Sequence, residues 1–137
     1  MKNGWKEGGI MRRIVLDMQC ALFADAISQA LTGSEIDFEP LLSESPDDTV
    51  ALCKSSNAYA IILEIAGYPP RRLEERLVLC EEIRANAPGC KLVLLVDEKA
   101  DEALAAKVRQ AKKDGLVDNF IYASVSPTYL SAVIDAL

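Results

Sequence analysis

Two short, uninterrupted apolar runs constrain the fold of this chain more than any other feature. The first spans residues 58–63 and is closed by Glu64 and the turn residues Gly67 and Pro69, and the second is Lys91–Val96. Runs this short and rich in branched side chains predict strands that are buried on both faces, as in parallel sheets. Doubly wound α/β folds bind ligands at the carboxyl ends of such strands, so Glu64 is the first candidate site residue.

Strand-like and helix-like segments alternate five times along the chain. The strands are expected at residues 13–17, 36–42, 58–65, 91–96 and 119–122, each followed by a helical segment. Pro40 cannot donate to a β-ladder, which places the second strand at an edge. The alternation predicts a three-layer, doubly wound sandwich around a five-stranded parallel sheet of order 2-1-3-4-5.

Caps and apolar stripes locate the helices more closely. Ser45 and Ser126, each followed by proline, predict the N-terminal caps of the second and last helices. Spacing assigns the buried face of the first helix to Leu22, Ala26, Ile27, Ala30 and Leu31.

The third helix is expected over residues 71–86. Leu73, Leu77 and Cys80 form its apolar stripe, whereas Glu74-Glu75-Arg76 is expected to lie in solvent. The fourth helix is expected over residues 101–113, again with its charged side chains in solvent.

Length and charge restrict the classes of function. The 137 residues suffice for one domain, which we place at residues 12–137, preceded by a disordered leader over residues 1–11 or by a start at Met11. The net charge of −6 argues against a nucleic-acid surface in this chain. No signal peptide or membrane span is evident, so a cytoplasmic location is expected.

The nucleophilic and metal-binding residue types give little chemistry. The chain has no histidine, and its four cysteines, which lack CxxC spacing, are expected to be reduced. Cys20 has no glycine- or arginine-bearing loop around it and is expected to be a buried or half-buried residue at a helix start. No metal, cofactor or enzymatic activity is therefore expected.

Five βα units with Glu64 ending the third strand resemble the receiver domain of bacterial response regulators. The resemblance covers residues 12–137. It rests on Ala21-Leu22-Phe23, Ile61-Ile62-Leu63-Glu64-Ile65, Lys91-Leu92-Val93-Leu94-Leu95, and Phe120-Ile121-Tyr122 followed by Ser126-Pro127. In that family an acidic pair binds magnesium, an aspartate accepts phosphate, and a Thr or Ser and a lysine hold the phosphoryl oxygens.

Every one of these five motif positions departs from the family pattern. Met18 and Gln19 match the acidic pair, with Asp17 one residue earlier, while Glu64, Val96 and Ala123 match the acceptor, the hydroxyl and the lysine. The resemblance therefore implies a pseudo-receiver that works through protein contacts in bacterial signalling, and in transcription where an output domain is attached. The alternative is a receiver that still accepts phosphate from a histidine kinase through a non-standard metal site.

Two acidic positions leave alternatives open. Glu64 is either a built-in phosphate mimic or, as we favour, an acid that points into solvent, because Val96 and Ala123 leave nothing to sense a mimic. Asp17, Glu64 and Asp97 are either a displaced metal site or, as we favour, three solvated acids.

The resemblance also points to a working surface. Phe120 matches the aromatic switch position and is expected to pack inward permanently, because Val96 replaces its hydroxyl partner. The fourth helix, fifth strand and fifth helix are expected to form a homodimer or partner face that includes Arg109, Lys112, Tyr122, Tyr129 and Asp135.

Overall fold

The fold is a five-stranded parallel sheet of order β2-β1-β3-β4-β5 with helices on both faces, as predicted. The computed structural model describes residues 11–97 and 99–137, so the expected leader lies outside the described residues except for Met11. In chain order the elements are β1 (Arg12–Asp17), α1 (Ala21–Thr32), β2 (Phe38–Leu42), α2 (Pro46–Ser55), β3 (Ala60–Glu64), α3 (Leu73–Asn86), β4 (Lys91–Val96), α4 (Glu102–Lys113), β5 (Asn119–Tyr122) and α5 (Pro127–Asp135).

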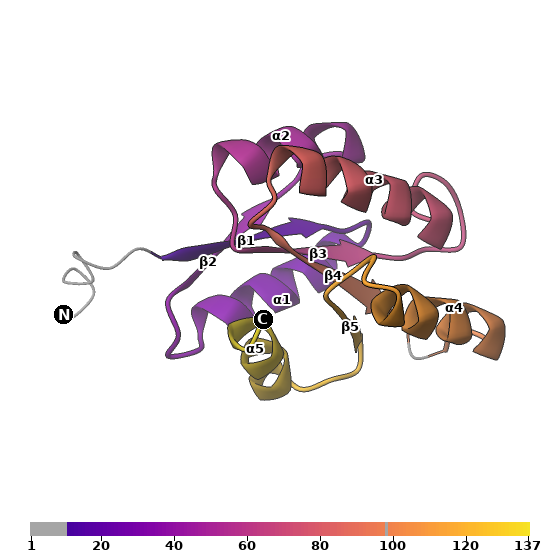
Figure 1. The fold of residues 1–137 in the computed structure, drawn as a ribbon. Helices are drawn as coiled ribbons and strands as arrows, with labels where there is room; N and C mark the ends of the chain where they lie inside the picture. Colours follow the sequence, from indigo (N-terminus) through magenta and orange to yellow (C-terminus); the bar gives the residue numbers. More distant parts are fainter. Residues whose placement is uncertain (1–10, 98) are drawn as a thin grey trace.

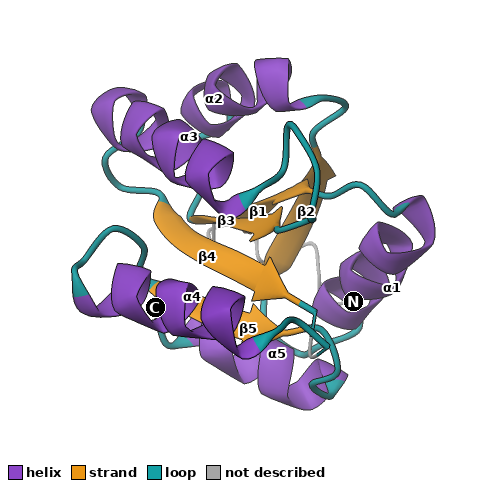
Figure 2. Ribbon diagram, turned by 90° about the vertical axis from the view of Figure 1, so that its right-hand side faces the viewer, coloured by secondary structure: helices purple, strands orange, loops and turns teal. Residues whose placement is uncertain are grey.

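Two apolar cores lie on opposite faces of the sheet. Figures 1 and 2 show α2 and α3 on one side of the sheet and α1 and α5 on the other. Side chains alternate along β3, so Ile61 and Leu63 pack with α2, α3 and α4, whereas Ile62 packs with α1 and α5. Burial on both faces explains why β3 and β4 read as continuous apolar runs.

The predicted edge strand and helix caps are confirmed. β2 pairs with β1 at the edge of the sheet, with Pro40 opposite Ile14. Ser45 Oγ accepts the Asp47 backbone N–H at the start of α2. Ser126 Oγ accepts the Tyr129 N–H at the start of α5. These bonds satisfy backbone donors that have no partner within the helix.

The predicted burial of the first helix is partly wrong. α1 packs on the sheet through Ala24, Ile27 and Leu31, whereas Leu22 is 80% exposed and Ala26 is also exposed. Leu22 precedes Ala24 by two positions, which rotates it about 200° around the helix and away from the sheet. A list of apolar residues at near-helical spacing therefore overestimated the width of the buried stripe.

The thiols also differ from expectation at one position. Cys53, Cys80 and Cys90 are free and buried, and Cys20 is free but exposed at the N-cap of α1. Burial raises the pKa of the Cys80 thiol from 9.0 to about 12. The buried thiols therefore act as small apolar groups of the core.

No helix within the described ranges is both long and apolar enough to cross a bilayer.

Candidate functional site

Glu64 ends β3 and turns toward the start of α1. Its Oε1 accepts the backbone N–H groups of Gln19, at 2.5 Å, and Cys20, at 3.3 Å. α1 has no side-chain cap of its own and no acidic residue in its first turn, so Glu64 supplies the negative charge that a helix N-terminus favours. The expectation that Glu64 points into solvent is therefore wrong.

Asp17, at the end of β1, is fully buried and surrounded by donors. Its Oδ1 accepts Arg76 Nη2 at 3.1 Å and Arg71 Nη2 at 3.2 Å, and its Oδ2 accepts the Thr49 hydroxyl at 2.7 Å. Ser43 extends the network by a hydrogen bond to Thr49. The expectation of a solvated acid is wrong for Asp17, because two guanidinium groups balance its charge in the interior.

Arg76, on α3, is the most unexpected member of this network. It is fully buried, although the sequence placed it in solvent. Its Nε donates to the Glu64 carbonyl oxygen at 2.8 Å, and its Nη2 donates to both the carbonyl and the carboxylate of Asp17. Arg76 therefore joins the carboxyl ends of β1 and β3 beneath the candidate site.

Arg71 connects the loop between β3 and α3 to Asp17 at the end of β1. Besides Asp17, it donates to the Gln19 side-chain oxygen at 2.8 Å, and its own carbonyl accepts the Ala66 N–H. The side chain of Arg71 is only 9% exposed. Sequence analysis missed both arginines, although Arg76 lies three residues after Leu73 and four before Cys80, on the apolar stripe.

The positions that match the family's metal site do not form one. Met18 is buried in the core beside α1 and α5, and Gln19 is exposed with its side chain bonded to Arg71. Among the residues that the structure describes, no group of three potential metal ligands comes together. Magnesium needs several free oxygen ligands, and both oxygens of Asp17 are already bonded.

A cavity of about 590 Å³ lies at the carboxyl edge of the sheet, beside this network. Glu64, Val96 and Ala123 line it, so the structure brings together three of the predicted site residues there. Its further lining residues are Cys20, Phe23, Ile65, Ala66, Gly67, Tyr68, Leu95, Asp97, Lys99, Ala100 and Leu104. The residues at the hydroxyl and lysine positions therefore contribute apolar walls in place of phosphate-binding groups.

Three of the five expected interaction residues gather at a second hollow, together with Phe120 of the aromatic switch position. Lys112, Phe120, Tyr122 and Tyr129 line a cavity of about 490 Å³ at α4, β5 and the start of α5. Phe120 is half-buried against the core and meets Tyr122 edge-to-face, with ring centroids 5.7 Å apart. Lys112 lies over the Phe120 ring, 5.9 Å from its centroid.

The other two expected interaction residues, Arg109 and Asp135, do not line this hollow. Arg109 is on α4 and pairs with Glu102 at 2.6 Å. Asp135 is at the far end of α5, where it pairs with Arg12 of β1. The sequence placed Asp135 on the correct helix but could not show that β1 is its neighbour.

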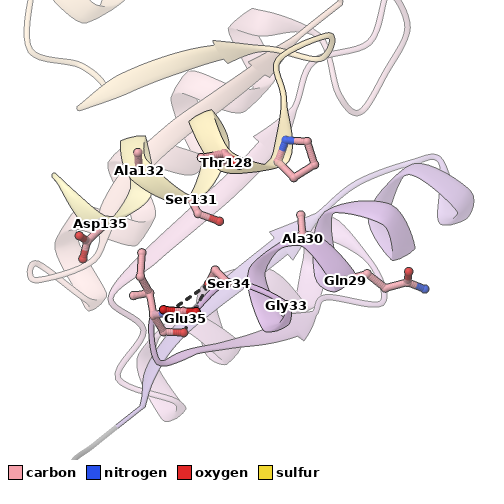
Figure 3. Close-up of a pocket in the computed structure, with 11 residues that line it drawn as sticks. Gln29, Ala30, Gly33, Ser34, Glu35, Thr128, Ser131, Ala132 and Asp135 are labelled. Atoms are coloured by element: carbon pink, nitrogen blue, oxygen red, sulfur yellow. Dashed lines mark hydrogen bonds between the residues drawn. The ribbon is translucent and has the colours of Figure 1, made fainter.

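Asp135 instead lines a third cavity, of about 650 Å³, between the end of α1 and α5 (Figure 3). Ser131 Oγ points into the space between these helices in Figure 3 and has no hydrogen-bond partner. This cavity shares no lining residue with the cavity beside Glu64.

Known proteins resemble this chain in architecture but not in sequence. No protein-family model matches the chain, and no curated protein matches it. A response regulator from Thermotoga maritima has a TM-score of 0.72 at 15% identity, over 93% of this chain and 97% of the other. The fold is that of a receiver domain.

Further solved structures share this receiver fold. A CheY-like response regulator receiver domain protein from Methanospirillum hungatei has a TM-score of 0.72 at 16% identity and covers 93% of each chain. A protein from Rhodopirellula baltica described as an adenylate cyclase has a TM-score of 0.74 at 19% identity, covering 93% of this chain and 87% of the other. Identities this low establish the fold alone, so any function must be argued from the site.

Proposed function

We propose that this chain is a pseudo-receiver, a signalling module of the bacterial response-regulator type that works through protein contacts without phosphorylation. The buried network of Asp17, Arg71 and Arg76 is the observation that carries the proposal. It lies next to the site where a receiver binds magnesium, and its carboxylate is already neutralised by two cations.

A metal ion at Asp17 would have to displace these partners. Binding would break the bonds of Asp17 to Arg71, Arg76 and Thr49 and would bring a further positive charge next to two buried guanidinium groups. Buried charges without partners cost several kcal/mol each, on the order of 3–5 kcal/mol for a broken pair. The network therefore opposes the metal that phosphoryl transfer requires.

The acceptor position is equally unsuited to the reaction. Glu64 Oε1 is held by two backbone N–H groups at the start of α1. Val96 and Ala123, which line the same cavity, offer no hydroxyl or ammonium group to a phosphoryl oxygen. We do not assign Glu64 the role of a phosphate mimic, because Val96 and Ala123, at the two positions that hold the phosphoryl group in receivers, cannot respond to its charge.

Titration with beryllofluoride and magnesium, followed by ¹H–¹⁵N NMR on the full chain, tests the absence of phosphoryl chemistry. We expect no shift of the Glu64 amide or its neighbours, and no mass increase at Glu64 after treatment with acetyl phosphate. A receiver domain with an intact acidic pair and lysine serves as the positive control. A stoichiometric adduct at Glu64 would establish the alternative, a phosphate-accepting receiver that uses Asp17 for metal.

We further propose that the hollow formed by Lys112, Phe120, Tyr122 and Tyr129 is the face for a homodimer or a protein partner, in the cytoplasm. Tyr129 is 57% exposed beside it, and aromatic anchors next to a cation are typical of interfaces. Sedimentation velocity at micromolar concentration should show a dimer that Lys112→Glu and Tyr129→Asp weaken. The charge reversal Glu35→Lys, at the α1–α5 cavity, is the control and should leave the dimer intact. A wild-type monomer would rule out the homodimer.

A further inference from the structure

The cavity at the carboxyl edge of the sheet has apolar walls at the positions where receiver domains carry phosphate-binding groups. Phe23, Val96, Leu104 and Ala123 line it, together with the exposed ring of Tyr68. Its volume of about 590 Å³ falls within the range of small-molecule pockets, roughly 300–1,000 Å³. Ligands of doubly wound folds bind at this edge, so the position and the size both suit a small molecule.

The polar groups of the cavity favour a ligand without negative charge. Glu64 uses Oε1 for the two backbone N–H groups of α1, and no hydrogen bond to its other carboxylate oxygen is seen among the described residues. Glu64 also forms no ion pair there, in contrast to the neutralised Asp17. Asp97 adds a second carboxylate to the lining, and Lys99 is the cation among the described lining residues.

We propose that this cavity binds a small aromatic amine, with its ring against the apolar walls and its ammonium group on the free oxygen of Glu64. The proposal rests on the absence of phosphoryl chemistry proposed above, because a phosphoryl group would occupy the same space. Binding at this edge would join the start of α1, the β3–α3 loop and the loop after β5. The ligand would thereby regulate the module in place of phosphate.

Tryptamine and indole-3-propionate are matched probes, because they share the indole ring and a two-carbon chain but carry opposite charges. In ¹H–¹⁵N NMR titrations of the full chain, tryptamine should shift the amides of Glu64, Val96 and Ala123. We expect its Kd to be about tenfold lower than that of indole-3-propionate, in keeping with one charge-assisted hydrogen bond. Glu64→Gln should remove this difference, since the amide oxygen can still accept the N–H groups of α1.

A pair of alanine variants separates this cavity from others. Ala123→Leu should fill the cavity and abolish tryptamine binding, whereas Ala132→Leu, the same change at the α1–α5 cavity, should not affect it. Equal affinity for both probes, shifts confined to α1–α5 residues, or no binding at all would overturn the proposal. Beryllofluoride reports separately on the proposed function, because an adduct at Glu64 would contradict that function whatever the result with tryptamine.

Discussion

Replacing Arg76 with methionine should destabilise this domain more than any change to an exposed arginine. The guanidinium group is fully buried and forms bonds of 2.8 Å, 2.9 Å and 3.1 Å to Glu64 and Asp17. Methionine keeps most of the apolar stem but removes all three bonds, so two carbonyl oxygens lose a donor. Asp17 retains Arg71 and Thr49, which limits the loss.

The expected cost is about 3–5 kcal/mol, the usual loss when one partner of a buried ion pair is removed. Domains of this size have a total stability of about 5–15 kcal/mol, so the variant should fold but unfold at a much lower urea concentration. Arg76→Lys should recover little, because an ammonium group cannot reproduce the planar fork that bonds both strands.

Arg84→Met is a matched control on the same helix. Arg84 is 42% exposed, reaches Asp118 at 3.8 Å and donates to the exposed Gly115 carbonyl at 2.6 Å, so its loss should cost about 1 kcal/mol or less. Urea unfolding followed by circular dichroism measures both variants, and the double variant Asp17→Asn/Arg76→Met should cost less than the sum of its two single changes. If Arg76→Met proved no more harmful than Arg84→Met, the network would not stabilise the fold as argued.

Three further measurements address other contacts. Thr49→Val should cost about 1–3 kcal/mol in urea unfolding, because its hydroxyl is buried and bonded to Asp17 at 2.7 Å, whereas Thr32→Val at an exposed hydroxyl should cost less. The pKa of the Cys80 thiol is raised from 9.0 to about 12, so between these pH values the folded state keeps a proton that the unfolded state has lost. The free energy of unfolding should therefore fall by about 1.4 kcal/mol per pH unit in this range. In Cys80→Ala this contribution to the pH dependence of unfolding should be absent. Gly115→Ala should cost about 1 kcal/mol in thermal unfolding because Gly115 has a φ of +78°, and an equal effect of Gly89→Ala would contradict this explanation.

The sequence predicted the fold because each of its main indications is local and physical. Two apolar runs gave the central strands, and Pro40 gave the edge strand. Serine–proline pairs gave the starts of two helices. Alternation of strands and helices then leaves few topologies, because parallel crossovers are right-handed.

The site was predicted less completely, because its decisive contacts join distant segments. Glu64, Val96 and Ala123 do line one cavity, as their places at strand ends indicated. Arg76 was assigned to solvent because charged residues usually lie there, and only its position on the apolar stripe argued otherwise. The partner of Arg71 could not be inferred, since nothing local relates a loop arginine to an aspartate 54 residues earlier.

The shared carboxylate of Asp17 also constrains how this chain can change over generations. Loss of either arginine alone leaves the buried carboxylate of Asp17 less well balanced. Loss of Asp17 alone leaves two buried guanidinium groups without their carboxylate partner. Each single step away from the network therefore passes through a less stable protein, although a combined replacement by apolar residues need not. An acidic side chain introduced at Gln19 would not by itself form a magnesium site, because Arg71, which already bonds the Gln19 side chain, would compete with the metal for it. A change of this site toward metal binding would therefore need several coupled substitutions at once.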